Sequence, residues 1–119
     1  MEAENITKAI SAHGQWKERL ANAIASGTSD FDPEVVKLPD RCEFGKWLYG
    51  DNIPAGAKGS DYYRKALDLH AQFHAEAGTV LGLALQGERA KAEGLMTAGS
   101  KFDSLSTTLT TLLNEWKAA

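Results

Sequence analysis

The sequence predicts an all-α fold, an antiparallel four-helix bundle with a short additional helix that carries Cys42, and three observations lead to this prediction. Long stretches of the chain carry apolar residues at spacings of three and four, the period of one helix face. All three prolines lie in one connection, between residues 27 and 59. No stretch shows the strict apolar–polar alternation of a half-buried strand. With 119 residues, the chain fits one domain, residues 1–119.

The first long helix is expected over residues 3–26, with Gly27 ending it. Its apolar face consists of Ile6, Ile10, His13, Trp16, Leu20 and Ala23 or Ile24. A weaker helical signal follows, in which Asp32 can act as the N-cap and Pro33 takes the first helical position.

The additional short helix is expected over residues 41–49, with Gly50 ending it. Asp40 and Glu43 are three residues apart, as in a capping box, and would begin this helix. Cys42 would then lie in its first turn.

Two further long helices are expected, over residues 60–86 and 88–116, with Gly87 between them. The face of the first consists of Tyr63, Leu67, His70, His74, Ala77, Leu81 and Leu85. The face of the second consists of Leu95, Gly99, Phe102, Leu105, Leu109, Leu112 and Trp116. Three long helices and a shorter one, joined by a long connection, favour an antiparallel bundle.

A second apolar row on the helix over residues 60–86 contains Leu69, Phe73 and Val80. The face that a helix buries inside one bundle is narrow for two apolar rows. We therefore expect a homodimer, the alternative being that Phe73 and Val80 are buried inside a single bundle.

Composition excludes several classes of protein. The net charge is −3 and the 13 basic residues are scattered, which argues against a nucleic-acid partner. No apolar run approaches the roughly 20 residues of a membrane-spanning helix, so no membrane insertion is expected. The polar first seven residues do not resemble a signal peptide, which predicts a cytoplasmic protein.

All three histidines of the chain lie on the predicted apolar faces. His70 and His74 are four residues apart, so their side chains share one face of a helix and can share one metal ion. Alone, the pair could also be two polar residues at the edge of that face. Antiparallel packing could bring His13 to the same level of the bundle.

The single cysteine allows no intramolecular disulfide, and it could serve as packing, as a metal ligand or as a reactive thiol. A helix N-terminus favours the thiolate form, which binds metals. Three imidazoles and one thiolate suit tetrahedral zinc (Zn2+). A di-iron bundle would need Glu-x-x-His pairs, which are absent. A hydrolytic zinc site would need an open coordination position, so we expect no enzyme activity.

Three segments resemble the chemoreceptor zinc-binding domain of bacterial chemoreceptors and diguanylate cyclases. They are His13-Gly-Gln-Trp16, Cys42-Glu-Phe44-Gly45-Lys-Trp47 and His70-Ala-Gln-Phe-His74. The resemblance implies that one zinc ion is held by the three His and the Cys. It also implies a sensory role, with an attached or partner domain that carries out chemotaxis signalling or cyclic-di-GMP synthesis.

The other motif residues are expected to support the site. Trp16 follows His13 by one turn and would form a wall of the site, and Phe44 and Trp47 would anchor the short helix. Gly45 would allow another helix to approach the Cys42 turn.

The main hypothesis for function is a zinc-dependent sensory domain with Cys42 as its redox switch, because a thiolate is the most oxidisable ligand of the four. The alternative is a helical interaction module in which zinc has only a structural role.

Overall fold

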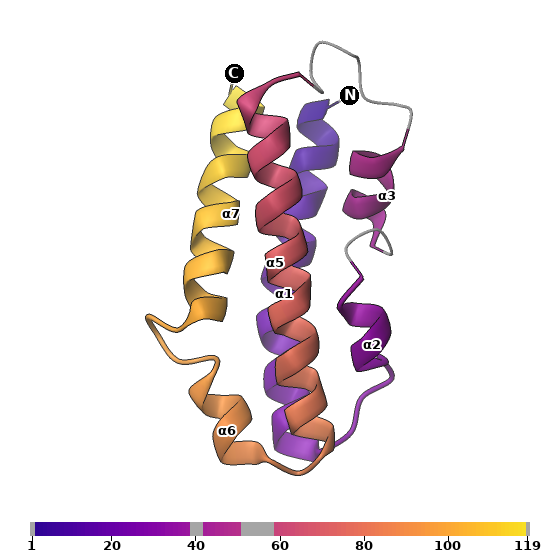
Figure 1. Cartoon of the computed structure of the whole chain (residues 1–119), viewed down its shortest axis with the longest axis vertical. Helices are drawn as coiled ribbons and strands as arrows, with labels where there is room; N and C mark the ends of the chain where they lie inside the picture. Colours follow the sequence, from indigo (N-terminus) through magenta and orange to yellow (C-terminus); the bar gives the residue numbers. More distant parts are fainter. Residues whose placement is uncertain (1, 39–41, 51–58, 119) are drawn as a thin grey trace.

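Three long helices form the frame of the molecule: α1 (Glu2–Ser26), α5 (Asp61–Leu85) and α7 (Lys101–Ala118). This is a computed structural model that describes residues 2–38, 42–50 and 59–118, and in it the three helices pack against one another (Figure 1). The described residues form helices, turns and bends but no strand, which confirms the all-α prediction.

The direction of the helices corrects the expected antiparallel arrangement. Helices α1 and α5 begin at the same end of the bundle and run in the same direction, whereas α7 runs the opposite way (Figure 1). Between α1 and α5, the chain returns along the side of the bundle. This return carries two short helices, α2 (Pro33–Val36) and α3 (Glu43–Tyr49), one after the other. The fourth side of the bundle therefore consists of two short helices instead of one long helix.

The last predicted helix, over residues 88–116, is in fact two helices. Helix α6 spans Arg89–Gly94, and α7 begins only at Lys101. Gly99, which we had placed on the apolar face, is exposed and has a φ of 82°, a conformation that suits glycine. The Ser100 hydroxyl then accepts a hydrogen bond from the backbone N–H of Asp103 (3.2 Å), which caps the start of α7.

The ends of α1 and α5 follow the sequence prediction. Gly27 and Gly87 have φ values of 74° and 78°, so each ends its helix in a left-handed conformation. After α5, the backbone N–H of Glu88 donates to the carbonyl of Leu83 (2.9 Å), as in a Schellman motif.

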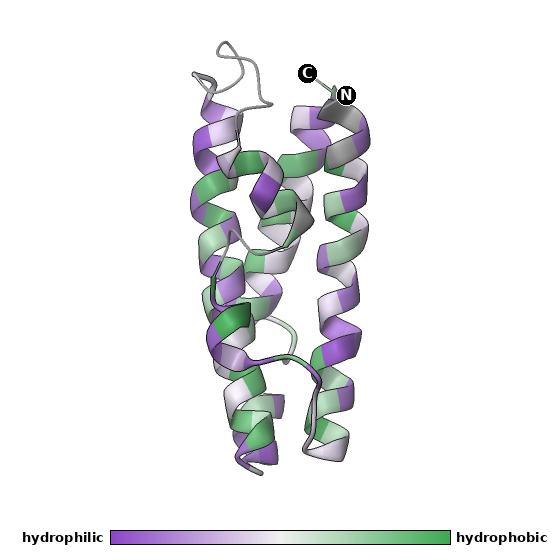
Figure 2. Ribbon diagram, turned by 90° about the vertical axis from the view of Figure 1, so that its right-hand side faces the viewer, coloured by the Kyte–Doolittle hydropathy of each residue, from purple (hydrophilic) through white to green (hydrophobic). Residues whose placement is uncertain are grey.

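The core lies between the three long helices, whose apolar and polar residues separate onto different faces (Figure 2). Its largest fully buried apolar side chains are Phe73, Phe102, Ile6, Leu20, Leu48, Leu81, Leu109, Leu113 and Val80. Phe73 and Val80 of the second apolar row are buried within one chain, and Leu69 is partly buried against the same core. That row therefore gives no reason to expect a dimer.

Within the described parts of the chain, no helix has both the length and the apolar character needed to cross a bilayer.

Candidate metal centre

The parallel direction of α1 and α5 places the three histidines at one level of the bundle. His13 is the twelfth residue of α1, and His70 and His74 are the tenth and fourteenth residues of α5. The ring centroids of His13 and His70 are 4.9 Å apart, and those of His70 and His74 are 4.5 Å apart. All three side chains are buried.

Cys42 reaches this cluster from the N-terminus of α3. It is the N-cap of that helix and is not in its first turn, because the helix begins at Glu43. The expected start at Arg41 and the capping role of Asp40 lie outside the described residues. The Cys42 Sγ atom accepts a hydrogen bond from the backbone N–H of Gly45 (3.3 Å), and this donor favours the thiolate.

The four side chains offer ligand atoms that all lie within 4.8 Å of one another. Cys42 Sγ and His70 Nε2 are 3.4 Å apart. In tetrahedral zinc sites, bond lengths of about 2.0–2.1 Å to nitrogen and 2.3 Å to sulfur imply ligand–ligand distances of about 3.4–3.6 Å. Shifts of about 1 Å in side-chain position would therefore bring the donors to coordinating distance. No carboxylate belongs to this group of described residues, so its donor set suits zinc better than iron.

Two backbone carbonyls determine which ring nitrogen of His13 and of His74 carries the proton. His13 Nδ1 lies 2.6 Å from the carbonyl oxygen of Ala9, and His74 Nδ1 lies 2.9 Å from that of Val36. Because a carbonyl oxygen can only accept, each Nδ1 carries the hydrogen and each Nε2 keeps a lone pair. Such outer hydrogen bonds are typical of histidines that bind metals.

The Nε2 atom of His74 provides a direct test of the fit to a metal. It is buried, and no described residue forms a hydrogen bond with it. A buried polar atom in this situation is costly, and a metal ion among the four donors would satisfy it.

Burial also keeps the imidazoles of His13 and His74 neutral. Loss of hydration and, to a smaller extent, nearby His74 lower the pKa of His13 to about 4, against the opposing effect of its bond to Ala9. Burial likewise lowers the pKa of His74, while its bond to Val36 acts in the other direction. Both rings can therefore offer a lone pair at neutral pH without first losing a proton.

Aromatic rings enclose the cluster on the α3 side. The Phe44 ring meets the rings of His13 and His70 edge-on, with centroid distances of 5.8 Å and 5.2 Å. It also stacks on Trp47 at 5.7 Å. Trp47 in turn packs against Trp116 of α7 at 5.7 Å, so these two aromatic residues connect α3 to the rest of the bundle.

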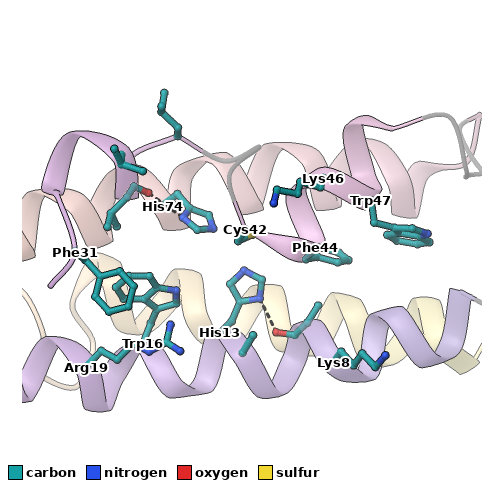
Figure 3. Close-up of a pocket in the computed structure, with 15 residues that line it drawn as sticks. Lys8, His13, Trp16, Arg19, Phe31, Cys42, Phe44, Lys46, Trp47 and His74 are labelled. Carbon is teal, nitrogen blue, oxygen red and sulfur yellow. Dashed lines mark hydrogen bonds between the residues drawn. The ribbon is translucent and has the colours of Figure 1, made fainter.

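A cavity of about 830 Å³ opens beside the cluster, between α1 and the returning segment (Figure 3). His13, Cys42 and His74 line it, as does Trp16. The Trp16 ring packs on Phe31 at 5.2 Å, and the Arg19 guanidinium covers both rings. The cavity therefore lies directly beside three of the four candidate ligands.

Sequence reasoning missed the backbone groups of the site. The carbonyls of Ala9 and Val36 and the N–H of Gly45 orient ligand atoms, yet no side chain marks them. Gly45 acts as a hydrogen-bond donor to the Cys42 sulfur. Its expected role in allowing another helix to approach stays a prediction.

Comparison with family models identifies the same segment as a known domain. The model of the chemoreceptor zinc-binding domain matches residues 13–81, more than half of the chain. The chain belongs to this family. Family membership, together with the His13, Cys42, His70 and His74 cluster, confirms zinc as the expected cofactor. Comparisons with curated proteins and with solved structures each found no significant match.

Proposed function

We propose that His13, Cys42, His70 and His74 hold one zinc ion in a sensory or regulatory domain of a bacterial signalling protein. The observation that carries this proposal is that ligand atoms of three imidazoles and the Cys42 sulfur, from α1, α5 and the N-terminus of α3, lie within 4.8 Å of one another. Four protein donors fill a tetrahedral shell, so the domain would have no catalytic water. We therefore propose that residues 1–119 form one regulatory domain in the cytoplasm and not an enzyme.

The output would belong to an attached or partner signalling domain, of the chemoreceptor or the diguanylate cyclase type. Bound zinc would link α1 and α5 to the N-terminus of α3. A change at any ligand would thus alter how the returning segment packs against the long helices, and a partner could detect that change.

Cys42 is the proposed redox switch. Its side chain is partly exposed and lines the cavity, and a thiolate is more easily oxidised than an imidazole. Hypochlorous acid would convert the thiolate to a sulfenic acid and release chloride (RS⁻ + HOCl → RSOH + Cl⁻). The sulfur would then be a weaker ligand, while three imidazoles could still hold the ion.

The packing of α3 limits how far this switch would move the chain. Leu48 is fully buried, Phe44 is nearly so, and the hydroxyl of Tyr63 donates to the carbonyl of Leu48 (2.7 Å). Burial of two such side chains contributes about 3–6 kcal/mol, which exceeds the loss of a single hydrogen bond. Oxidation should therefore loosen only the Cys42 end of α3, where the backbone N–H of Gly45 donates to the sulfur, and leave the helix docked through Phe44 and Leu48.

The ligand set is tested by measuring bound zinc per chain in the wild type and in alanine variants of the four residues. The wild type should bind one equivalent, and each variant should bind zinc more weakly in competition with a chromophoric chelator. Ser11→Ala, at an exposed position of α1, serves as the matched control. Unchanged affinity in any one of the four variants would remove that residue from the ligand set.

The switch is tested by hydrogen exchange of zinc-loaded protein before and after mild treatment with hypochlorite. The amides of Gly45 and Lys46, which donate to the Sγ atom and the carbonyl of Cys42, should lose protection. Cys42 that is oxidised without this loss would favour the alternative, a helical interaction module in which zinc has only a structural role. Removal of zinc would then lower stability without changing any output.

We also propose a homodimer, on a different basis from the buried second row. Several large apolar side chains remain exposed, namely Phe31, Val35, Leu38, Tyr49 and Leu85. The first four belong to the returning segment, so a partner covering them would contact the zinc-linked part of the domain. Light scattering at high protein concentration should give twice the chain mass, and a monomer would contradict the proposal.

A further inference from the structure

Gly78 of α5 faces α2 where the two helices pack together. It is buried, and a Cβ atom built on it would collide with Cγ of Lys37 and lie 2.9 Å from the carbonyl oxygen of Pro33. The Lys37 side chain would have to change its rotamer to make room. The Pro33 carbonyl is backbone and already accepts the N–H of Lys37 (3.1 Å), so any side chain at residue 78 would push α2 outward.

The same short helix supplies the hydrogen-bond acceptor of a candidate ligand. Val36, the last residue of α2, is buried, and its carbonyl accepts Nδ1–H of His74 at 2.9 Å. Gly78 follows His74 by four residues and so lies on the same face of α5, one turn further along. One face of α5 thus carries both the ligand and the glycine against which α2 packs.

We infer that Gly78 is a positioning residue of the metal centre, acting through α2. Its missing side chain lets α2 approach until the Val36 carbonyl holds Nδ1–H of His74, which leaves Nε2 facing the other donors. The inference rests on the proposed ligand set, because it assumes that His74 binds zinc. By linkage, zinc binding and the docking of α2 stabilise each other. The returning segment would therefore respond to zinc at α2 as well as at Cys42.

The test compares Gly78→Ala with Gly82→Ala as its matched control. Gly82 lies one turn further along α5, and a Cβ atom there would meet only Pro33 Cβ, at an ordinary 3.9 Å. Removal of an outer hydrogen bond typically weakens metal binding about 10–100-fold, so the zinc affinity of Gly78→Ala should fall by that factor. The affinity of Gly82→Ala should stay within about twofold of the wild type.

A second readout separates positioning from general loss of stability. Nitrogen-15 NMR of the His74 ring should show a protonated Nδ1 in the wild type and in Gly82→Ala. In metal-free Gly78→Ala, that tautomer should no longer dominate, although circular dichroism should show an unchanged helix content. Wild-type affinity together with a wild-type His74 ring signal in Gly78→Ala would overturn the inference.

The wild type itself gives a further test if Gly78→Ala does not fold. Adding zinc should slow hydrogen exchange at the amides of Lys37 and Leu38, which close the α2 turn onto Pro33 and Val35. Unchanged exchange would contradict the coupling. Failure of the ligand assignment is recognised separately, because zinc binding would then be insensitive to His74→Ala.

Discussion

The metal-free protein should lose stability in mild acid. Below pH 6.5 His13 is protonated in the unfolded chain but stays neutral in the folded chain, and this difference favours unfolding. Burial lowers the pKa of His13 from 6.5 to about 4 in the folded chain. Between these two values the unfolded chain binds more protons, so stability is present above pH 6.5 and declines as the pH falls toward 4. For His13 alone, the expected loss between pH 7 and pH 5 is about 2 kcal/mol.

The assay is urea unfolding of the wild type and of His13→Gln in the presence of a chelator, at pH 7, 6 and 5. The wild type should lose more stability than the variant on acidification, by roughly the 2 kcal/mol calculated for His13. The lowered pKa of His74 acts in the same direction and persists in the variant. Carboxylates contribute equally to both proteins, so their effect cancels in the comparison. An equal loss in the two proteins would refute the conclusion that His13 is buried as a neutral imidazole.

Three other substitutions have defined expectations. Cys42→Ser should retain zinc through the three histidines but bind it more than about 100-fold more weakly than the wild type in chelator competition. Loss of a direct ligand should lower zinc affinity more than loss of an outer hydrogen bond does. Leu48→Ala should lower the free energy of unfolding by about 2–5 kcal/mol in urea, because the side chain is fully buried. Gly99→Ala should cost about 1–2 kcal/mol in thermal or urea unfolding, owing to its φ of 82°. Gly94→Ala is the control, because a Cβ atom at this position meets open space, and it should be neutral or slightly stabilising. Equal effects of the two glycine substitutions would contradict the break between α6 and α7.

The sequence by itself determined the helical class, the main helix boundaries and the family. Apolar spacing depends on residues three or four apart, which are neighbours within one helix whatever the tertiary fold. The left-handed glycines at residues 27 and 87 are equally local, and they end α1 and α5 as expected. Gly99 and the Ser100–Asp103 spacing are local signals of the break before α7. The apolar pattern that continues across them led to the prediction of one long helix.

The chemistry of the candidate site was likewise determined by the sequence, because only four side chains of the chain supply thiolate or imidazole donors. Histidines on apolar faces must be buried, and buried imidazoles need partners. The donors could therefore be named from His13, Cys42, His70 and His74 before any distance was known.

Only the tertiary structure decided how these groups are arranged. The parallel direction of α1 and α5 follows from the return of the chain along the bundle, in which α2 packs against α5 and α3 packs against α1. Cys42 became the N-cap of α3, where its sulfur accepts the N–H of Gly45. The carbonyl that orients His74 belongs to Val36, 38 residues away in the chain. Such contacts depend on which backbone groups meet across the fold. Because every residue carries the same carbonyl group, side-chain chemistry alone could not identify the carbonyls that orient the ligands.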